Sequence, residues 1–471
     1  MTDIFYQIIN QLPEMQDIEL TDDQKRAVQQ FLTFYSADAG KDTFVMTGSA
    51  GTGKTLLISL FSVFFKKMGW KTILLAPTGR AAKVISKRSR KPAYTIHHHV
   101  FSVEEGLGST PFFSVKNNKE TAKVVYIIDE SSMIGDQKDE SLRSGLLQNL
   151  LNYVFQDNVP RKLMFIGDPV QLPPIGNDFS PALDPQFLDR EYGLNIYFAH
   201  LAEVKRQAYD SLVLENAVLI RDAYLNGEEN PVLELQYGRD VQTMDNAYDA
   251  LETYSGYFES GNLDKVLFLC YSNNKAMQIN LAIRQKILDN ETQEVLVAGD
   301  LIMVVRNNYT WGTEFFPFLA NGEMGAVIEV YPETLEEKYG LKWMNVLLGF
   351  ENNMGEMKEI ECKVVLDLLQ SKLGQLSPEQ TYKIWQERQS FYLEMSKQEA
   401  AQGIAKDPYI NALQIKYGYC ITGHKSQGGQ WQNVIIAFEP NYGGDIHQYI
   451  RWTYTVFTRA EERVFMLGSP F

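Results

Sequence analysis

The sequence predicts an α/β protein built on parallel sheets, and three observations lead to this class. Residues 20–205 contain short apolar runs, several of them separated by stretches with helical spacing. These runs lack the apolar–polar alternation of half-exposed strands, as expected for strands buried on both faces. One run leads directly into a glycine-rich loop, residues 48–55, that opens a helix. Because 471 residues are many for a single core, we expect two to four domains. A second α/β region begins near Val241, which divides the chain into 1–240 and 241–471.

In the first domain, four apolar runs are the expected strands: DTFVMT at 42–47, KTILLAP at 71–77, VVYIID at 124–129 and KLMFIGD at 162–168. The segment 100–123 interrupts this rhythm, because its Gly, Ser, Pro and Asn residues stand between aromatic pairs. Such a texture predicts a projecting hairpin. Phe112 and Phe113 within it are either exposed aromatic residues or core residues, and the sequence leaves both interpretations open.

In the second domain, the expected strands are KVLFLCYS at 265–272, WQNVIIAFEP at 431–440 and ERVFMLG at 462–468. An insertion at about 325–410 has a sequence pattern that differs from that of the surrounding α/β region. Its first part, about 325–375, predicts a small β-barrel that forms a separate lobe. Its second part predicts one long helix, which Ser377 caps together with Gln380 and which Gly403 ends.

The composition restricts the kind of partner. With 44 basic and 59 acidic residues, the net charge of −15 argues against a protein that coats nucleic acid by bulk electrostatics, so any such site is a local groove. The basic run KVISKRSRK at 83–91 is either part of that groove or a solvated helix end. We find no signal peptide and no membrane-spanning apolar run, so we expect a soluble, cytoplasmic protein without a membrane partner. Cys270, Cys362 and Cys420 are expected to be buried free thiols.

The loop GSAGTGKT has the pattern of a phosphate cradle. Glycines let the backbone turn its N–H groups toward phosphate oxygens, Lys54 adds a positive charge, and the Thr55 hydroxyl suits Mg²⁺. The expected nucleotide contacts here are Gly48, Ser49, Ala50, Gly51, Thr52, Gly53, Lys54 and Thr55. By itself the loop predicts only that a nucleoside triphosphate binds, because kinases, GTPases and motor ATPases share it.

Polar residues at the ends of two other expected strands complete a candidate reaction centre. Asp129 can hold Mg²⁺ through water, and Glu130 can orient or deprotonate the attacking water. Gln171, in a proline-rich loop, can touch both the terminal phosphate and that water. Upstream, Gln24 either pairs with an adenine edge or is an ordinary polar surface residue.

Two polar clusters near the end of the chain, TGHKSQGGQW at 422–431 and YTVFTRA at 454–460, adjoin expected strands. Arg459, delivered from the second domain, can neutralise charge in the transition state, with Arg206 as its partner. Two domains that share one nucleotide would open and close with hydrolysis. Thr78, Thr95 and Thr422 offer hydroxyl groups to the phosphates of a polymer.

The motifs TDDQ, GSAGTGKT, APTGRAA, IIDESSM, GDPVQLPP, VKRQ, TGHKSQG and YTVFTRA occur here in the order found in superfamily 1 helicases of the RecD/Dda-like branch. The sequence resembles that family from Gln24 to Arg459. This resemblance implies two RecA-like P-loop parallel-sheet domains, with a hairpin insertion in the first and an SH3-like β-barrel plus a helical insertion in the second. It implies a motor that uses ATP and Mg²⁺, moves 5′ to 3′ on single-stranded DNA and separates forked duplexes, with the hairpin as the strand-splitting pin. Because one chain carries the complete set of motifs, we expect it to function as a monomer.

The resemblance also completes the set of expected contacts. Gly428 and Gln430 join the nucleotide contacts, although the family more often has an acidic residue at the position of Gln430. The residues expected to contact the DNA strand are Pro77, Thr78, Gly79, Arg80, Thr95, His97, Phe112, Phe113, Thr422, His424 and Lys425. His97–His99 are three histidines where the family has one, and three in succession cannot all face one metal ion on a regular element.

Two other functions are weighed against a helicase. One is an ATP-gated switch that grips DNA or a partner without separating strands. The other is a small-molecule kinase, which the arginines expected from two domains oppose. A strand-splitting pin distinguishes the first alternative from a helicase, because a clamp needs no wedge.

Overall fold

The computed structural model describes residues 2–10, 19–104, 112–121, 123–138, 144–204, 211–227, 233–261, 265–288, 295–308, 310–311, 319–351, 356–439 and 445–470. The chain forms two compact units. The first contains Met1–Pro77, Ala81–Glu104 and Pro111–Gly227, and the second consists mainly of Glu228–Phe471, with Thr78–Arg80 grouped with it. Across the described part of the chain, no helix combines the length and the apolarity needed to cross a bilayer.

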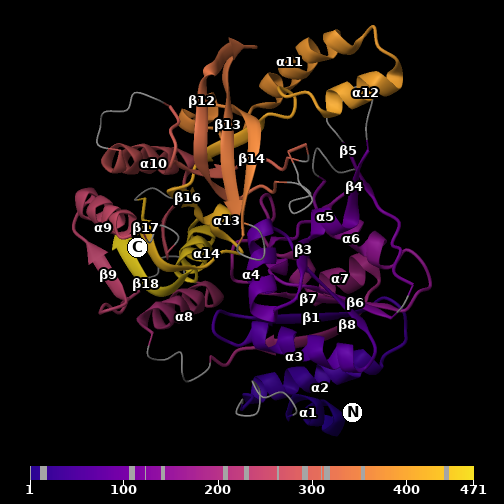
Figure 1. Ribbon diagram of the computed structural model, residues 1–471. Coiled ribbons are helices and arrows are strands. Elements are labelled where there is room, and N and C mark those ends of the chain that lie inside the picture. Colours follow the sequence, from indigo (N-terminus) through magenta and orange to yellow (C-terminus); the bar gives the residue numbers. More distant parts are fainter. Residues whose placement is uncertain are drawn as a thin grey trace. The chain divides into compact units, whose positions relative to one another are not determined.

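The first unit is organised around a six-stranded sheet in which every described pair of strands is parallel. In spatial order its strands are β3 (Ala93–Thr95), β2 (Lys71–Ala76), β6 (Val124–Ile128), β7 (Arg161–Gly167), β1 (Asp42–Gly48) and β8 (Asn195–Leu201) (Figure 1). The four predicted strands are confirmed as β1, β2, β6 and β7. The sequence analysis missed β8, an edge strand in which only Ala199 and Leu201 are buried.

Helices cover both faces of this sheet, as a parallel sheet requires. Those packed on one face are α1 (Thr2–Asn10), α2 (Asp22–Ser36), α3 (Lys54–Lys67) and α4 (Gly79–Ser89). Those on the other are α5 (Ile96–Val100), α6 (Leu146–Val154) and α7 (Pro185–Tyr192), with the short turns η2 (Ser131–Met133) and η3 (Pro181–Leu183) nearby. On the first face the rings of Phe31 and Phe61 stack with centroids 3.9 Å apart, so aromatic packing joins α2 to α3. Helix α8 (Leu212–Leu225) is the last helix of the first unit along the chain.

The predicted hairpin is present. Strands β4 (Phe101–Glu104) and β5 (Phe112–Val115) pair antiparallel, with Phe101 opposite Val115. Residues 105–111 and the side chains of Phe112 and Phe113 lie outside what the structure describes. Whether these two rings are exposed or belong to the core therefore stays open.

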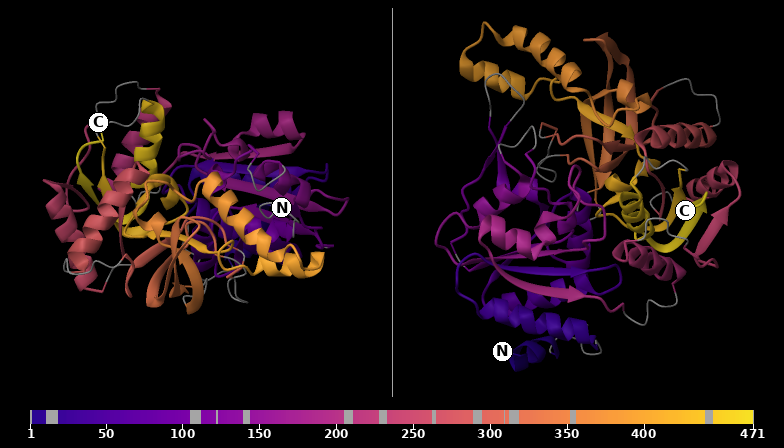
Figure 2. Two further views of the ribbon diagram at one scale, coloured as in Figure 1. Left: turned by 90° about the horizontal axis from the view of Figure 1, so that it is seen from above. Right: turned by 180° about the vertical axis from the view of Figure 1, so that it is seen from behind.

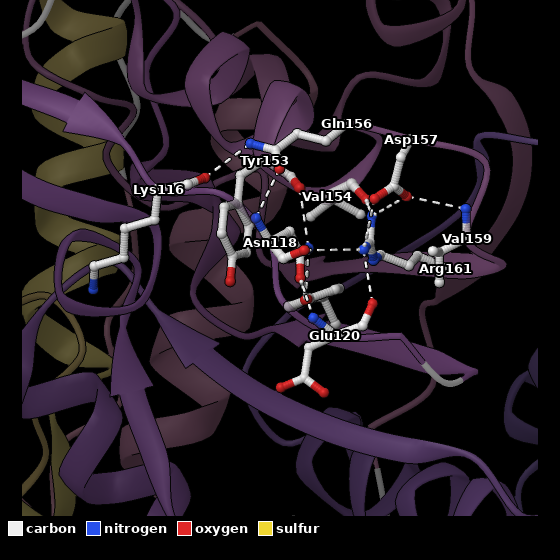
Figure 3. A network of polar contacts seen from close by, with 10 residues as sticks. Lys116, Asn118, Glu120, Tyr153, Val154, Gln156, Asp157, Val159 and Arg161 are labelled. Atoms are coloured by element: carbon white, nitrogen blue, oxygen red, sulfur yellow. Dashed lines mark hydrogen bonds and ion pairs between the residues drawn. The ribbon is translucent and has the colours of Figure 1, made fainter.

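A network of hydrogen bonds fastens the chain just after this hairpin to the sheet (Figure 3). Asn118 is buried; its Nδ2 donates to the carbonyl of Tyr153 at 3.0 Å, and its backbone N–H donates to Gln156 Oε1 at 2.7 Å. From β7, the buried Arg161 donates through Nη2 to the carbonyl of Glu120 at 2.8 Å. The second leg of the hairpin is thereby anchored at its root.

The second unit contains a five-stranded sheet whose described pairs are also parallel. Its strands, in spatial order, are β16 (Cys420–Thr422), β10 (Val266–Cys270), β17 (Trp431–Ala437), β18 (Ala460–Leu467) and β9 (Val241–Met244). Its helices are α9 (Ala247–Glu259), α10 (Asn273–Ile287), α13 (Gly423–Ser426) and α14 (Ile446–Phe457). The three predicted strands are confirmed as β10, β17 and β18, and all three cysteines are buried free thiols as expected.

A closed five-stranded barrel is inserted into this unit, and its long strands are seen from two further sides in Figure 2. Its strands are β11 (Leu301–Val304), β12 (Met324–Lys338), β13 (Leu341–Glu351), β14 (Met357–Val365) and β15 (Leu413–Tyr417). The barrel therefore extends beyond the predicted 325–375, because β11 and β15 pair with each other to close it. Because β11 and β15 lie far from each other in the sequence, no local sequence pattern could reveal that they close the barrel.

The single long helix predicted after the barrel is wrong. A short turn η6 (Asp367–Gln370) leads instead to α11 (Pro378–Gln389), the turn η7 (Ser390–Tyr392) and a separate α12 (Lys397–Ala405). The capping box of Ser377 and Gln380 is present, but Ser396 and Glu399 form a second one that starts a new helix. Gly403 lies inside α12 rather than at a helix end, and a Cβ there would stand 2.4 Å from the Tyr392 ring.

Candidate nucleotide and nucleic-acid site

The candidate residues of the first unit converge because their strands are parallel. The glycine-rich loop follows β1, Gln171 follows β7, and Asp129 follows β6. These three strands are neighbours in the sheet, in the order β6, β7, β1. Ligands of such sheets bind at the carboxyl edge, so the fold brings the predicted reaction centre together at one place.

The glycine-rich loop has the curled backbone that a phosphate cradle needs. Gly51 and Gly53 have φ values of +78° and +87°, a left-handed region that residues with a Cβ rarely adopt. Gly53 is the residue directly before α3, so the loop leads into a helix N-terminus. The Lys54 ammonium folds back onto the loop and donates to the carbonyls of Gly48 at 2.7 Å and Ser49 at 3.0 Å.

Gln24 is not an ordinary surface residue, because its side chain is fully buried beneath the loop. Its Nε2 donates to the carbonyl of Thr52 at 2.9 Å, while its Oε1 accepts from the backbone N–H of Thr21 at 3.1 Å. A Cβ on Gly53 would stand 2.4 Å from Gln24 Nε2, so the glycine permits this brace. Contact of Gln24 with an adenine stays a prediction.

Asp129 and Glu130 follow a strand that is wholly buried. Burial, and then the adjacent Glu130 carboxylate, raise the pKa of Asp129 to about 6, whereas Lys54 and other groups oppose the rise. Glu130 has φ +54°, a left-handed conformation that costs a residue with a Cβ of the order of 1–3 kcal/mol. Its backbone N–H donates to Asp129 Oδ1 at 2.9 Å, which fixes the Asp129 carboxyl group against this turn.

Gln171 lies in the loop after β7 and is buried. The loop is held by its own backbone, since Gln171 N donates to the carbonyl of Asp168 at 3.2 Å. Asp168 Oδ1 also accepts from Val170 N at 3.0 Å. This arrangement agrees with a stiff loop, although it leaves the contact of Gln171 with a phosphate as a prediction.

Of the two predicted arginines, the structure describes one. Arg206 lies outside the described residues. Arg459, between α14 and β18, is 2% exposed, and its guanidinium donates to the carbonyls of Thr455 at 3.0 Å and Gly429 at 3.2 Å. A third bond runs from Arg459 Nη2 to Thr458 Oγ1 at 3.1 Å, so the guanidinium is fixed within its own unit, and its role at a phosphate stays a prediction.

Thr95 and the three histidines after it are placed by α5. The Thr95 hydroxyl accepts from His98 N at 3.1 Å and caps this helix. The rings diverge: His97 packs near Phe101, whereas His99 lies between aromatic residues and shares a hydrogen bond of 3.3 Å with the Tyr153 hydroxyl. Burial, and then Lys116, lower the pKa of His99 to about 4. No group of three or more His, Cys, Asp or Glu residues that could hold a metal occurs in the portion described.

The other residues of the first domain that are predicted to contact DNA lie directly after β2 and at the start of α4. They are Pro77, Thr78, Gly79 and Arg80. In the second unit, Gly428 and the exposed Gln430 lie between α13 and β17. Thr422 ends β16, and His424 and Lys425 lie in α13.

A small cavity of about 20 Å³ lies beside this last group, and it is also lined by a residue that the sequence analysis missed. Thr422, Lys425 and Lys416 all line it. Burial lowers the pKa of Lys416 to about 8, and burial together with Lys416 lowers the pKa of Lys425 to about 8. Lys416 lies in the fully buried strand β15, and a lysine in such a strand is the signal that could have identified it.

Comparison with known proteins agrees with these features. Residues 19–222 match the family model for an AAA domain, and residues 417–467 match that for a UvrD-like helicase C-terminal domain. The chain is 24% identical to an uncharacterized protein of Methanocaldococcus jannaschii over 450 residues, 90% of this chain and 36% of that protein. It is 28% identical to the ATP-dependent DNA helicase dda of Enterobacteria phage T4 over 293 residues, 61% of each chain. The chain thus spans less than two thirds of either relative.

Among solved structures, Pif1 helicase from Bacteroides in complex with ADP-AlF3 and ssDNA aligns with 96% of this chain and 94% of its own, at 15% identity and a TM-score of 0.47. The two family matches occur in the order in which the motifs lie along the chain. The chain is thus similar to an AAA domain in its first part and to a UvrD-like helicase C-terminal domain in its last part, and it shares partial sequence similarity with the dda helicase.

Proposed function

We propose that the protein is an ATP-dependent DNA helicase that moves 5′ to 3′ along single-stranded DNA and separates duplexes, as a monomer in the cytoplasm. The observation that supports it best is the meeting of the glycine-rich loop, Asp129 with Glu130, and Gln171 at the carboxyl edge of three adjacent strands. That set supplies a phosphate cradle, a cation ligand, a base and a residue that can sense the terminal phosphate.

The residues of the first unit suit ATP with Mg²⁺. Thr55 and Asp129 offer the hard oxygen ligands that Mg²⁺ prefers, and the raised pKa of Asp129 marks a carboxylate whose charge the protein alone compensates poorly. When bound, the cation would neutralise charge on the phosphates. Lys54 would exchange its two loop carbonyls for phosphate oxygens, and Glu130 would take the proton of the attacking water.

The residues of the second unit suit the backbone of a DNA strand. Lys416 and Lys425 line one cavity, which is too small to hold a phosphate itself, and burial lowers the pKa of both amines. A phosphate bound beside them would favour the charged form of each amine. Thr422 adds a hydroxyl to the same lining. Such a site is a local cation cluster in a protein whose overall charge is negative.

Unwinding of forked DNA tests the proposal. Two forks with the same duplex are compared, one with a 5′ single-stranded tail and the other with a 3′ tail, each in the presence of ATP and Mg²⁺. We expect strand separation only with the 5′ tail. Separation only with the 3′ tail would overturn the direction, and ATP hydrolysis stimulated by DNA without separation of either fork would indicate the switch instead.

Replacing Lys425 by alanine should weaken binding of single-stranded DNA. Loss of one phosphate contact is expected to reduce the slope of log affinity against log salt by about 0.7. Because the pKa of Lys425 is about 8, binding by the unaltered protein should also weaken as pH rises through 8, and less so in the variant. Titration of a labelled oligonucleotide at several salt concentrations and pH values measures both effects. Lys383→Ala, at an exposed lysine of α11, is the control.

Replacing Asn118 by alanine should uncouple unwinding from ATP hydrolysis. The variant loses the side-chain bonds of Asn118 with the Tyr153 carbonyl and the Glu120 N–H, which we expect to cost about 1–3 kcal/mol locally and to loosen the pin. Strand separation on a 5′-tailed fork should fall, while DNA-stimulated ATP hydrolysis stays near its original rate. Asn152→Ala, at an exposed residue of α6, is the matched control. Equal losses of both activities would show that the network supports the domain rather than the pin.

A further inference from the structure

Helix α8 packs directly on the glycine-rich loop. A Cβ placed on Gly51 would stand 3.0 Å from Leu214 Cδ2 and 3.3 Å from Val204 Cγ1. The loop therefore has a wall on this side, formed by α8 and the chain after β8. None of the motifs recognised in the sequence includes this helix.

One side chain of α8 reaches the loop. Arg221 Nη1 donates to Ser49 Oγ at 3.0 Å. Its Nε and Nη2 donate to Asp222 Oδ1 at 2.9 and 2.7 Å, which fixes the plane of the guanidinium. These bonds use three of the five N–H donors that an arginine carries. The Arg221 side chain is 18% exposed, so it is much less hydrated than a surface arginine.

Two cations consequently meet at one residue of the loop. Lys54 Nζ donates to the carbonyl of Ser49 at 3.0 Å, and Arg221 donates to its hydroxyl. Asp222 offsets one of the two charges and is itself 50% exposed, so the water around it weakens its effect. The loop residue at which they meet lies where a triphosphate would place its negative charge.

We propose that Arg221 is a further residue of the nucleotide site and contacts the terminal phosphate of a bound nucleoside triphosphate. The inference rests on the proposed ATP-dependent function. A guanidinium suits the task because its planar fork can bond a phosphate through two N–H groups at once. Because Asp222 holds two of its nitrogens, little side-chain entropy is lost when the phosphate arrives.

The test compares binding of AMP-PNP and of ADP, each with Mg²⁺, to the full chain and to Arg221→Met. A contact with the terminal phosphate predicts about a tenfold loss of AMP-PNP affinity, whereas ADP affinity changes about twofold or less. Arg221→Lys should restore part of the loss, since it keeps the charge without the fork. Arg190→Met is the matched control, because Arg190 also pairs with the next residue, Glu191, but is 72% exposed.

Ser49→Ala separates a contact with phosphate from a merely structural bond. If Arg221 served only to hold Ser49, both variants would weaken AMP-PNP and ADP to the same degree, and the proposal would be overturned. Unaltered AMP-PNP affinity in Arg221→Met would overturn it as well. Failure of the unaltered protein to bind either nucleotide would instead contradict the proposed function, so the two failures are distinguishable.

Discussion

Replacing Glu130 by glutamine is expected to abolish most ATP hydrolysis while leaving ATP binding nearly unchanged. The amide keeps the size and shape of the side chain but cannot accept the proton of the attacking water, which predicts a fall of about 10²- to 10⁴-fold in kcat. Binding should persist because the glycine-rich loop and Lys54 are untouched. The measurement pairs DNA-stimulated phosphate release with direct titration of AMP-PNP.

The backbone of Glu130 supplies a second readout. Its φ of +54° is strained for a residue with a Cβ, and glutamine keeps that strain, so Glu130→Gln should unfold at nearly the original temperature. Glu130→Gly should relieve the strain and raise the free energy of unfolding by about 1 kcal/mol, yet it should be equally inactive. Glu191→Gln, at an exposed carboxylate of α7, serves as the control. Full DNA-stimulated hydrolysis in Glu130→Gln would show that the base has been misassigned.

The strands that position the site were predictable because short apolar runs in the sequence indicate buried strands. The runs that became β1, β6 and β7 have apolar centres and are buried throughout, and residues of the site end or follow each of them. Their convergence also followed from the sequence, since parallel strands share a carboxyl edge. By contrast, β8 is only partly buried at the edge of the sheet, and its sequence NIYFAHL carries no equivalent signal.

Features that depend on contacts between distant residues were not predictable. The barrel closes through Ile302 opposite Tyr417, a pairing across more than a hundred residues. The break after α11 was visible only as a second capping box, formed by Ser396 and Glu399, between two helical segments. Gln24 was read as a surface residue or an adenine contact, and its brace on the carbonyl of Thr52 required the fold.

Replacing Lys54 by alanine should remove nucleotide binding without unfolding the protein. The ammonium is already held at the loop by the carbonyls of Gly48 and Ser49, so little ordering is needed before it meets phosphate oxygens. Hydrogen bonds to charged groups contribute about 1.5–3 kcal/mol each, so loss of two predicts a fall in ATP affinity of at least a hundredfold. Titration with AMP-PNP measures the loss, and DNA-stimulated hydrolysis should vanish with it.

The loop itself should survive this substitution, because two braces remain. Gln24 Nε2 still donates to the carbonyl of Thr52, and Thr52 Oγ1 still donates to the carbonyl of Ser49 at 2.8 Å. Lys67→Ala, at the exposed far end of the same helix, controls for the loss of a lysine from α3 and should bind ATP normally. A Lys54→Ala protein that bound AMP-PNP as tightly as the control would mean that the phosphates lie elsewhere. A thermal transition far below that of the control would instead mean that Lys54 holds the loop together and that Gln24 and Thr52 are insufficient.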